Sequence, residues 1–280
     1  MTAPATTSTP TMNPAIITAP QRTAGPTTTV VEVARRTVRK FARSPQLAVV
    51  GTIQGAMFLL IFRYVFGGAI NTGHVSYVDF LVPGFVLTGV LFSGSSAASG
   101  VAEDLEAGFI DRLRSLPIPR SSVMAGRALA DTITAAWGLL ITTAIGFAVG
   151  FRLHASVGHA LAAFGLCIVA AYAFAWVFIF IGLVSGTAQA AQGISLLVFP
   201  LTFVSSGYVP VASMPGWMQP FANNQPITVM VNAVRSLVLG ANTGSTLPHS
   251  TGYYVGATFL WAAAISLVFG TLSILKYRKG

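Results

Sequence analysis

More than half of the acidic side chains of this 280-residue chain, together with several basic ones, lie in one stretch, residues 102–127, which reads AEDLEAGFIDRLRSLPIPRSSVMAGR. The stretch holds four of the seven Asp and Glu residues and four of the sixteen Lys and Arg residues. Asp131 follows Arg127 by four residues, which is the helical spacing of an ion pair. No nucleophile stands beside a base in this pattern, so it predicts ionic and packing contacts rather than catalysis.

Other signals of an enzyme or a metal protein are missing from the sequence. The four histidines, at 74, 154, 159 and 249, lack the spacing of metal ligands, and the single cysteine, Cys167, cannot form an internal disulfide. The chain has no G-x-x-x-x-G-K-[ST] phosphate-binding loop. We therefore expect no catalytic residue, no metal and no cofactor on this chain.

The composition indicates a membrane protein. Hydrophobic residues make up 54% of the chain and charged residues only 8%, against about 25% charged in a soluble domain. A bilayer core requires about 20 apolar residues in a helix. Six runs reach or approach that length: 46–66, 80–101, 132–150, 160–184, 192–209 and 253–274. The sequence predicts an all-α protein with a six-span domain over residues 45–280, each run being one helix.

The basic residues predict the orientation. Thirteen of the sixteen lie in three segments, 22–43, 112–127 and 276–279, which the six spans place on one side. Because basic loops stay in the cytoplasm, both termini are predicted to be cytoplasmic in the plasma (inner) membrane. The other three basic residues are isolated and lie on the outer side of the membrane or within its outer part: Arg63, Arg152 and Arg235. This distribution gives no support to nucleic-acid binding.

The N-terminal region divides into two parts. Residues 1–29, rich in Thr, Pro and Ala, are predicted to be a disordered cytoplasmic tail. Residues 30–44 alternate apolar and basic side chains at helical spacing, which predicts a helix lying in the membrane interface. Its basic face consists of Arg35, Arg36, Arg39 and Lys40. Such a helix either anchors the chain on anionic membrane lipid or braces a moving partner.

Within residues 102–127, Leu105, Phe109, Leu113 and Leu116 fall near one stripe of a predicted helix, which Pro117 ends. An apolar stripe on a short cytoplasmic helix needs a partner. The membrane surface, the protein's own helices and a soluble subunit all remain open as that partner.

Two further segments are candidates for the transport path. Residues 210–240 include a helix, 226–240, that is too short to span and is predicted to dip into the outer leaflet and return, as an outer gate or as a structural cap. Ser93 and Ser96 on the second span, with Phe199 and Phe203 on the fifth, are candidate path residues. The serines are equally suited to hydrogen bonds within the bundle, and the aromatic rings to contact with lipid.

Two blocks of the sequence resemble the permeases of ATP-binding-cassette (ABC) type-2 transporters, in particular the daunorubicin-resistance type of actinobacterial exporter. The first block contains Glu106, Gly108, Asp111, Arg112, Leu113, Pro117, Pro119, Arg120, Gly126 and Arg127. The second contains Pro200, Gly207, Pro210, Pro215, Trp217, Pro220, Asn224, Pro226, Arg235 and Gly240. The resemblance covers about residues 30–280.

The resemblance implies a mechanism and partners. Two six-helix permeases, identical or related, would face each other, and each would rest a coupling helix in a groove of an ATPase subunit that holds ATP and Mg. The carried-over coupling residues are Glu103, Leu105, Glu106, Gly108, Phe109, Arg112, Leu113 and Pro117. The carried-over outer-gate residues are Pro215, Trp217, Asn224, Pro226 and Arg235. The cargo would be a drug, a secondary metabolite or a lipid.

Two other classes of function fit parts of the sequence. An ion-coupled transporter normally places ionisable side chains at the membrane centre, and none occurs in the middle of the six runs. A membrane anchor for a soluble complex, without transport, would use the same loop at 102–127.

Overall fold

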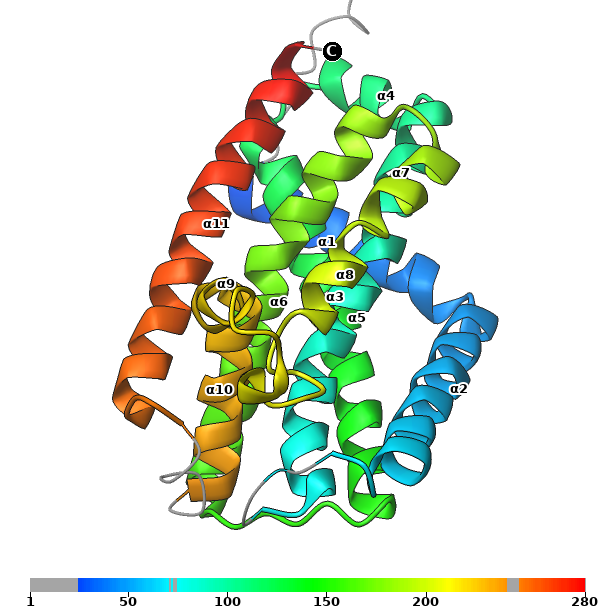
Figure 1. Cartoon of the computed structure of the whole chain (residues 1–280). Helices are drawn as coiled ribbons and strands as arrows, with labels where there is room; N and C mark the ends of the chain where they lie inside the picture. The colour runs from blue at the N-terminus through cyan, green and yellow to red at the C-terminus, as the bar shows by residue number, and fades with distance from the viewer. Residues whose placement is uncertain (1–24, 71, 73–74, 241–246, 280) are drawn as a thin grey trace, which may run out of the picture.

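The computed structural model is a bundle of helices (Figure 1). It describes residues 25–70, 72, 75–240 and 247–279, and no strand occurs among them. The α-helices are α1 (Pro26–Ala42), α2 (Pro45–Ile61), α3 (Tyr77–Glu106), α4 (Phe109–Ser115), α5 (Arg120–Ala148), α6 (Val157–Ser185), α7 (Ala188–Ser195), α8 (Val198–Phe203), α9 (Gln219–Asn224), α10 (Pro226–Leu239) and α11 (Thr251–Lys279). A π-helical turn, η2 (Phe62–Phe66), extends α2, and a short 3₁₀ turn, η3 (Val211–Ser213), precedes α9.

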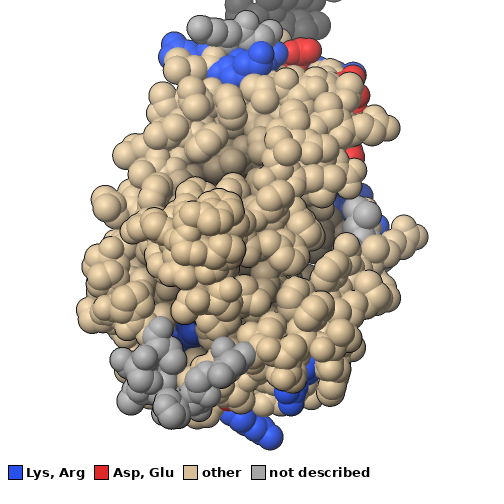
Figure 2. Space-filling model, in the orientation of Figure 1, with Lys and Arg blue, Asp and Glu red and all other residues tan. Residues whose placement is uncertain are grey.

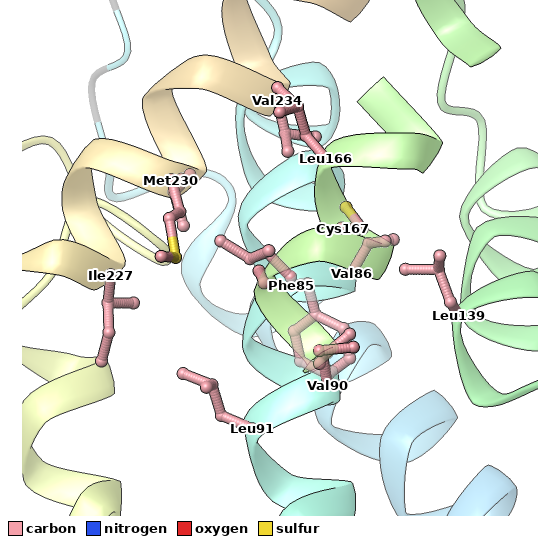
Figure 3. Close-up of a cluster of buried hydrophobic side chains, with 14 of the residues drawn as sticks. Phe85, Val86, Val90, Leu91, Leu139, Leu166, Cys167, Ile227, Met230 and Val234 are labelled. Carbon is pink, nitrogen blue, oxygen red and sulfur yellow. The ribbon is translucent and has the colours of Figure 1, made fainter. Parts of the chain in front are cut away.

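Helix α3 forms the centre of the bundle, between α5, α6, α7 and α10. The Ser76 side chain caps its first turn by accepting a hydrogen bond from the Asp79 N–H. Its buried side chains pack against α5, α6 and α10, as Figure 3 shows for Phe85, Val86 and Val90. Nearly every residue from Tyr77 to Leu91 is buried, so this half of α3 contacts protein on all sides.

Five helical segments are long and apolar enough to cross a membrane: Val49–Phe66, Tyr77–Glu106, Arg120–Ala148, Val157–Ser185 and Thr251–Arg278. They contain five of the six predicted runs, apart from a few residues at two run ends.

The remaining run, 192–209, is not one helix, so that part of the prediction is wrong. The chain is interrupted after Ser195, resumes as α8 and turns again after Phe203. Pro200 explains the first break because it cannot donate a hydrogen bond to the carbonyl of Leu196.

Helices α7, α8 and α10 together follow one path through the bundle. In Figure 1, α7 lies in the upper part of the bundle, α8 continues toward the middle, and α10 runs on to the lower end. The loop and α9 between them fold over the middle of the bundle. The Gln225 side chain holds this fold by donating hydrogen bonds to the carbonyls of Leu201 and Val204. This path crosses the bundle without containing one long helix.

Helix α1 lies across the bundle rather than along it (Figure 1). It starts at Pro26 and ends at Ala42, so residues 26–29, assigned to the tail by the sequence, are helical. The rest of the predicted disordered tail, 1–24, lies outside the described residues. Helix α1 packs closely on α5 at Gly126, where an added Cβ would meet the backbone and side chain of α1 at 2.7 and 2.9 Å. Gly126 therefore permits this crossing.

Charged side chains concentrate at the end of the bundle that carries α4 and the C-terminus. Figure 2 shows basic and acidic side chains at this end, a broad uncharged surface below it, and a few basic side chains at the opposite end. We call these the α4 end and the opposite end, which also carries the α5–α6 loop.

Candidate functional site

The junction between α3 and α4 is a sharp turn at Gly108. Gly108 has φ 65°, the left-handed region that favours glycine, and it ends α3 and starts α4. The prediction of one helix carrying Leu105, Phe109, Leu113 and Leu116 is therefore wrong. Leu105 belongs to α3, while Phe109 and Leu113 belong to the seven-residue α4, and Leu116 follows it.

The apolar side of α4 contacts the protein's own helices. Ile110 is 4% exposed, and its cluster includes Val101 of α3 and Met124 of α5. Leu105 and Leu113 pack against the same cluster, as does the aromatic ring of Tyr277 from α11. Of the three partners that the sequence left open, the protein's own helices are the one these side chains contact.

The rest of the α4 segment faces outward. Glu106, Arg112, Leu116 and Pro117 are exposed, and Leu116 is 51% exposed despite its apolar side chain. The segment thus presents a small mixed surface to solvent while its other side is fixed to α3, α5 and α11.

An ionic cluster lies beneath this turn and joins three helices. Asp104 of α3 pairs with Arg36 of α1 at 3.0 Å and with Arg127 of α5 at 3.1 Å. Arg127 also pairs with Asp131 at 3.1 Å and donates to the carbonyl of Ala97. All four charged groups are thus balanced, two cations against two carboxylates. We call Arg36, Asp104, Arg127 and Asp131 the α4-end cluster.

The basic face of α1 reaches the α3–α4 turn through two of its four predicted residues. The Arg36 guanidinium lies 3.6 Å from the centre of the Phe109 ring, so one side chain contacts both Asp104 and α4. Lys40 pairs with Glu103 at 2.8 Å on the surface. Arg35 pairs with Glu32 of its own helix, and Arg39 is exposed.

Arg235 is the centre of a second polar site, in the half of the bundle that carries the α5–α6 loop. It is 1% exposed, and its guanidinium donates to the backbone carbonyls of Phe80 and Ser206 and to the side chain of Asn232. The guanidinium also lies 3.7 Å from the Phe80 ring centre. All its acceptors are neutral, and the side chain ties α10 to α3 and to the turn after α8.

The other four predicted gate residues precede Arg235 in the sequence, and their exposure differs from that of Arg235. Trp217 is 79% exposed, Pro215 and Asn224 are exposed, and Pro226 occupies the first turn of α10. The hydrogen bonds of the Arg235 guanidinium go to Phe80, Ser206 and Asn232.

An aromatic row lies beside the second polar site. Ring centres of neighbouring residues are separated by 4.6 Å for Phe92–Phe199, 5.2 Å for Phe199–Phe203, 4.9 Å for Phe203–Tyr208 and 5.0 Å for Tyr208–Phe62. The two candidate path residues Phe199 and Phe203 thus lie together, with Phe203 39% exposed. Of the two serines, Ser96 is exposed, and Ser93 donates a hydrogen bond to Val90 of its own helix.

Sequence reasoning missed two residues of these sites. Asp104 is one of them, because nothing local in the sequence indicates that Arg36, 68 positions away, approaches it. Tyr208 is the other, because its position in an apolar run does not indicate a partner on α3. Tyr208 is 3% exposed, and its hydroxyl donates to Thr88 of α3.

These features define a multi-pass helical membrane protein with most of its ion pairs at one end. The chain belongs to the ABC-2 type transporter family, whose family model matches residues 28–239. It is 28% identical over 246 residues to the daunorubicin resistance ABC transporter permease protein DrrB1 of Streptomyces coeruleorubidus, covering 87% of this chain and 84% of the relative.

Two further relatives are similar over much of their length. The chain is 25% identical over 245 residues to the probable doxorubicin resistance ABC transporter permease protein DrrC of Mycobacterium tuberculosis, covering 87% of this chain and 86% of that protein. It is 24% identical over 208 residues to the putative transport permease ycf38 of Cyanophora paradoxa, covering 72% and 71%. Because two of these relatives are named as permeases of drug-resistance ABC transporters, the comparison supports the role of an ABC exporter permease for this chain.

Proposed function

We propose that this chain moves a hydrophobic or amphipathic molecule out across the plasma membrane, driven by ATP and Mg bound to a separate ATPase subunit. The observation that carries the proposal is the construction of the α4 end. Helix α4 contacts Arg36 of α1 through Phe109, and Arg36 is linked to α3 and α5 through Asp104 and Arg127, so a displacement of α4 reaches three helices. A rigid contact is what a partner needs to shift the bundle between two states.

The exposed side of the α4 segment is the proposed docking surface for the ATPase. It consists of Glu106, Arg112, Leu116 and Pro117. Three other coupling residues implied by the resemblance do not contact the ATPase in this proposal. Leu105 and Leu113 transmit force by packing inside the chain, and Gly108 forms the turn.

The proposed topology has six crossings with both termini in the cytoplasm. Five are the long helices, and the broken path α7–α8–α10 supplies the sixth. Two observations support this orientation. The C-terminus and α4 lie at the same end in Figure 1, and most basic residues belong to that end by sequence. In this topology α10 completes the sixth crossing instead of dipping into the outer leaflet and returning, and the loop and α9 lie at the middle of that crossing.

A second copy of the permease, identical or related, is proposed to pack beside α2 and the aromatic row. Helix α2 stands apart from the rest of the bundle in Figure 1 and exposes Val50, Ile53 and Met57. The row Phe92, Phe199, Phe203 and Tyr208 runs toward α2 through Phe62. Stacked rings with a half-exposed edge suit an amphipathic aromatic cargo. We place the transport path along this row, with Ser96 at its edge.

The test compares an exposed with a packed residue of the α4 segment. The tagged chain is purified with its bound ATPase from cells expressing both, and cargo-stimulated ATP hydrolysis and drug efflux are measured. Leu116→Asp is expected to leave thermal stability unchanged and to abolish stimulation and efflux. Leu105→Asp is expected to lower the amount of folded protein. Normal efflux with Leu116→Asp would defeat the docking surface, and an ATPase that binds without any stimulation would favour a membrane anchor.

A further inference from the structure

A groove with a volume of about 310 Å³ lies between α3, α5, α6 and α10. It is close to the opposite end of the bundle, because residues of the α5–α6 loop line it. This volume falls at the lower end of the range of small-molecule sites, about 300–1,000 Å³. Its lining comes from four helices, and includes Val82, Val86, Leu139, Phe147, Phe164 and Val234. None of the residues used by the α4-end cluster or by the aromatic row lines it.

The groove offers almost nothing to water. The Thr143 hydroxyl, one of its few polar groups, already donates to the carbonyl of Leu139 at 2.8 Å. A bound water requires two to four polar partners, so water is not a stable occupant. An apolar occupant is required if the space is filled.

One side of the groove opens where hydrocarbon would surround the protein. Leu140 of α5 and Leu161 of α6 line the groove and are 51% and 68% exposed. Both belong to helices long and apolar enough to span a membrane. A lipid chain can therefore enter sideways from the bilayer, without passing through water.

The α5–α6 loop beside the groove carries a cation. Arg152 is exposed and stands in the sequence between two lining residues, Phe151 and Leu153. Its backbone N–H donates to the Asp79 carboxylate at 2.9 Å, which fixes this part of the α5–α6 loop. Within the described part of the chain, the Arg152 guanidinium forms no ion pair. A guanidinium at this position suits a phosphate oxygen.

We propose that the groove binds one acyl chain of an anionic phospholipid, with the lipid phosphate held by Arg152. The apolar lining and the sideways access from the bilayer match the acyl chain of such a lipid. The cation beside the groove matches its phosphate. With the orientation proposed above, the lipid belongs to the outer leaflet. The site involves neither the ATPase nor the cargo path.

The test uses the purified full chain in phosphatidylcholine nanodiscs, without nucleotide or partner. Trace phosphatidylglycerol or phosphatidylcholine, each spin-labelled on the acyl chain, reports the motionally restricted lipid by electron paramagnetic resonance. We expect a restricted component that is larger for phosphatidylglycerol. Arg152→Gln should reduce the preference for phosphatidylglycerol about fivefold, which is the effect of one basic residue near an anionic lipid surface.

Two alanines give a matched pair of variants. Ala160→Phe fills the groove and should remove the excess restricted component, whereas Ala144→Phe adds the same ring to an exposed position of α5 outside the lining. Val157→Phe, at the exposed rim, serves if Ala160→Phe does not fold. Equal restricted components in the groove-filling variant and Ala144→Phe would overturn the proposal.

Competition identifies the occupant. Excess unlabelled phosphatidylglycerol should release the labelled lipid. If an amphipathic drug released the labelled lipid and unlabelled phosphatidylglycerol did not, the lipid assignment would be wrong and the groove would be a binding site for cargo. Because the measurement contains no ATPase, a negative result leaves the transport proposal untouched, and a failure of transport leaves the lipid site untouched.

Discussion

The two polar sites of this protein use arginine in different ways. In the α4-end cluster, Arg36 and Arg127 contact carboxylates from other parts of the chain, and the Arg36 side chain is 41% exposed. At the second site, Arg235 is buried and contacts only neutral acceptors. The Arg36–Asp104 pair lies near water and can break and reform at small cost, whereas a buried guanidinium held by carbonyls cannot leave without exposing unpaired groups. The first site therefore links helices through ionic contacts, and the second fixes α10 to α3.

Removing the buried guanidinium should have the largest effect. Arg235→Met removes the donor to the carbonyls of Phe80 and Ser206 and to the Asn232 side chain, which keeps its bond from the Ser206 hydroxyl, and each buried group left unpaired costs about 1–3 kcal/mol. We expect a loss of about 3 kcal/mol or more, seen as a lower thermal unfolding midpoint in detergent and a smaller folded yield. Arg152→Met, at an exposed position, is the control and should unfold as the wild type does. An unchanged midpoint for Arg235→Met would show that this site does not fix α10 to α3.

The next largest effect concerns the close approach of α3 to the turn after α8. An added Cβ at Gly84 would collide with the backbone of Gly207, whereas at Gly89 on the same helix it would meet nothing within 4 Å. Gly84→Ala should cost about 1–3 kcal/mol, because backbone must move. Gly89→Ala should be neutral or slightly stabilising. Thermal unfolding of the two variants side by side measures the difference, and equal midpoints would refute the close contact.

The long helices could be predicted from the sequence because their signal is local. Uncharged runs of about 20 residues, such as 160–184 within α6, leave the backbone no alternative to a helix in a membrane. The sequence did not predict the break at Gly108 or the one just before Pro200, although each has a local cause. The apolar pattern continues across both positions, so it indicates an uninterrupted helix. The path of α7, α8 and α10 depends on contacts of Gln225 and Arg235 with distant segments, which no local pattern reveals.

For the candidate site too, the sequence predicts the local contacts and not the long-range ones. The Arg127–Asp131 pair follows from a spacing of four residues on a helix. Asp104 links this pair to Arg36 only because α1 crosses α5 at Gly126. The sequence therefore indicates which segment of the α4 end is charged, but the partners of each charge depend on how α1 lies across the bundle.

A double-mutant cycle tests whether the α4-end cluster links helices through Asp104. Asp104→Asn removes the carboxylate shared by Arg36 and Arg127, but Arg127 keeps Asp131, so we expect a loss of only about 1–2 kcal/mol. Arg36→Gln should add little in the Asp104→Asn background, giving a coupling energy of about 1 kcal/mol by thermal or denaturant unfolding. Strict additivity of the two changes would mean that α1 is not held through Asp104. Efflux should fall in both variants even where the folded yield is normal.

The smallest effect is expected at the surface pair Lys40–Glu103, which joins the same two helices as Arg36 and Asp104. Its side chains are 54% and 51% exposed, so water screens the attraction. Lys40→Gln should change the free energy of unfolding by about 0.5 kcal/mol or less, and the difference from wild type should vanish at high salt. The comparison with Arg36→Gln is informative because both residues lie on one face of α1 and differ mainly in the Asp104 and Phe109 contacts. If Lys40→Gln cost as much as Arg36→Gln, the hold of α1 on the α3–α4 turn would come from general charge attraction rather than from these two contacts.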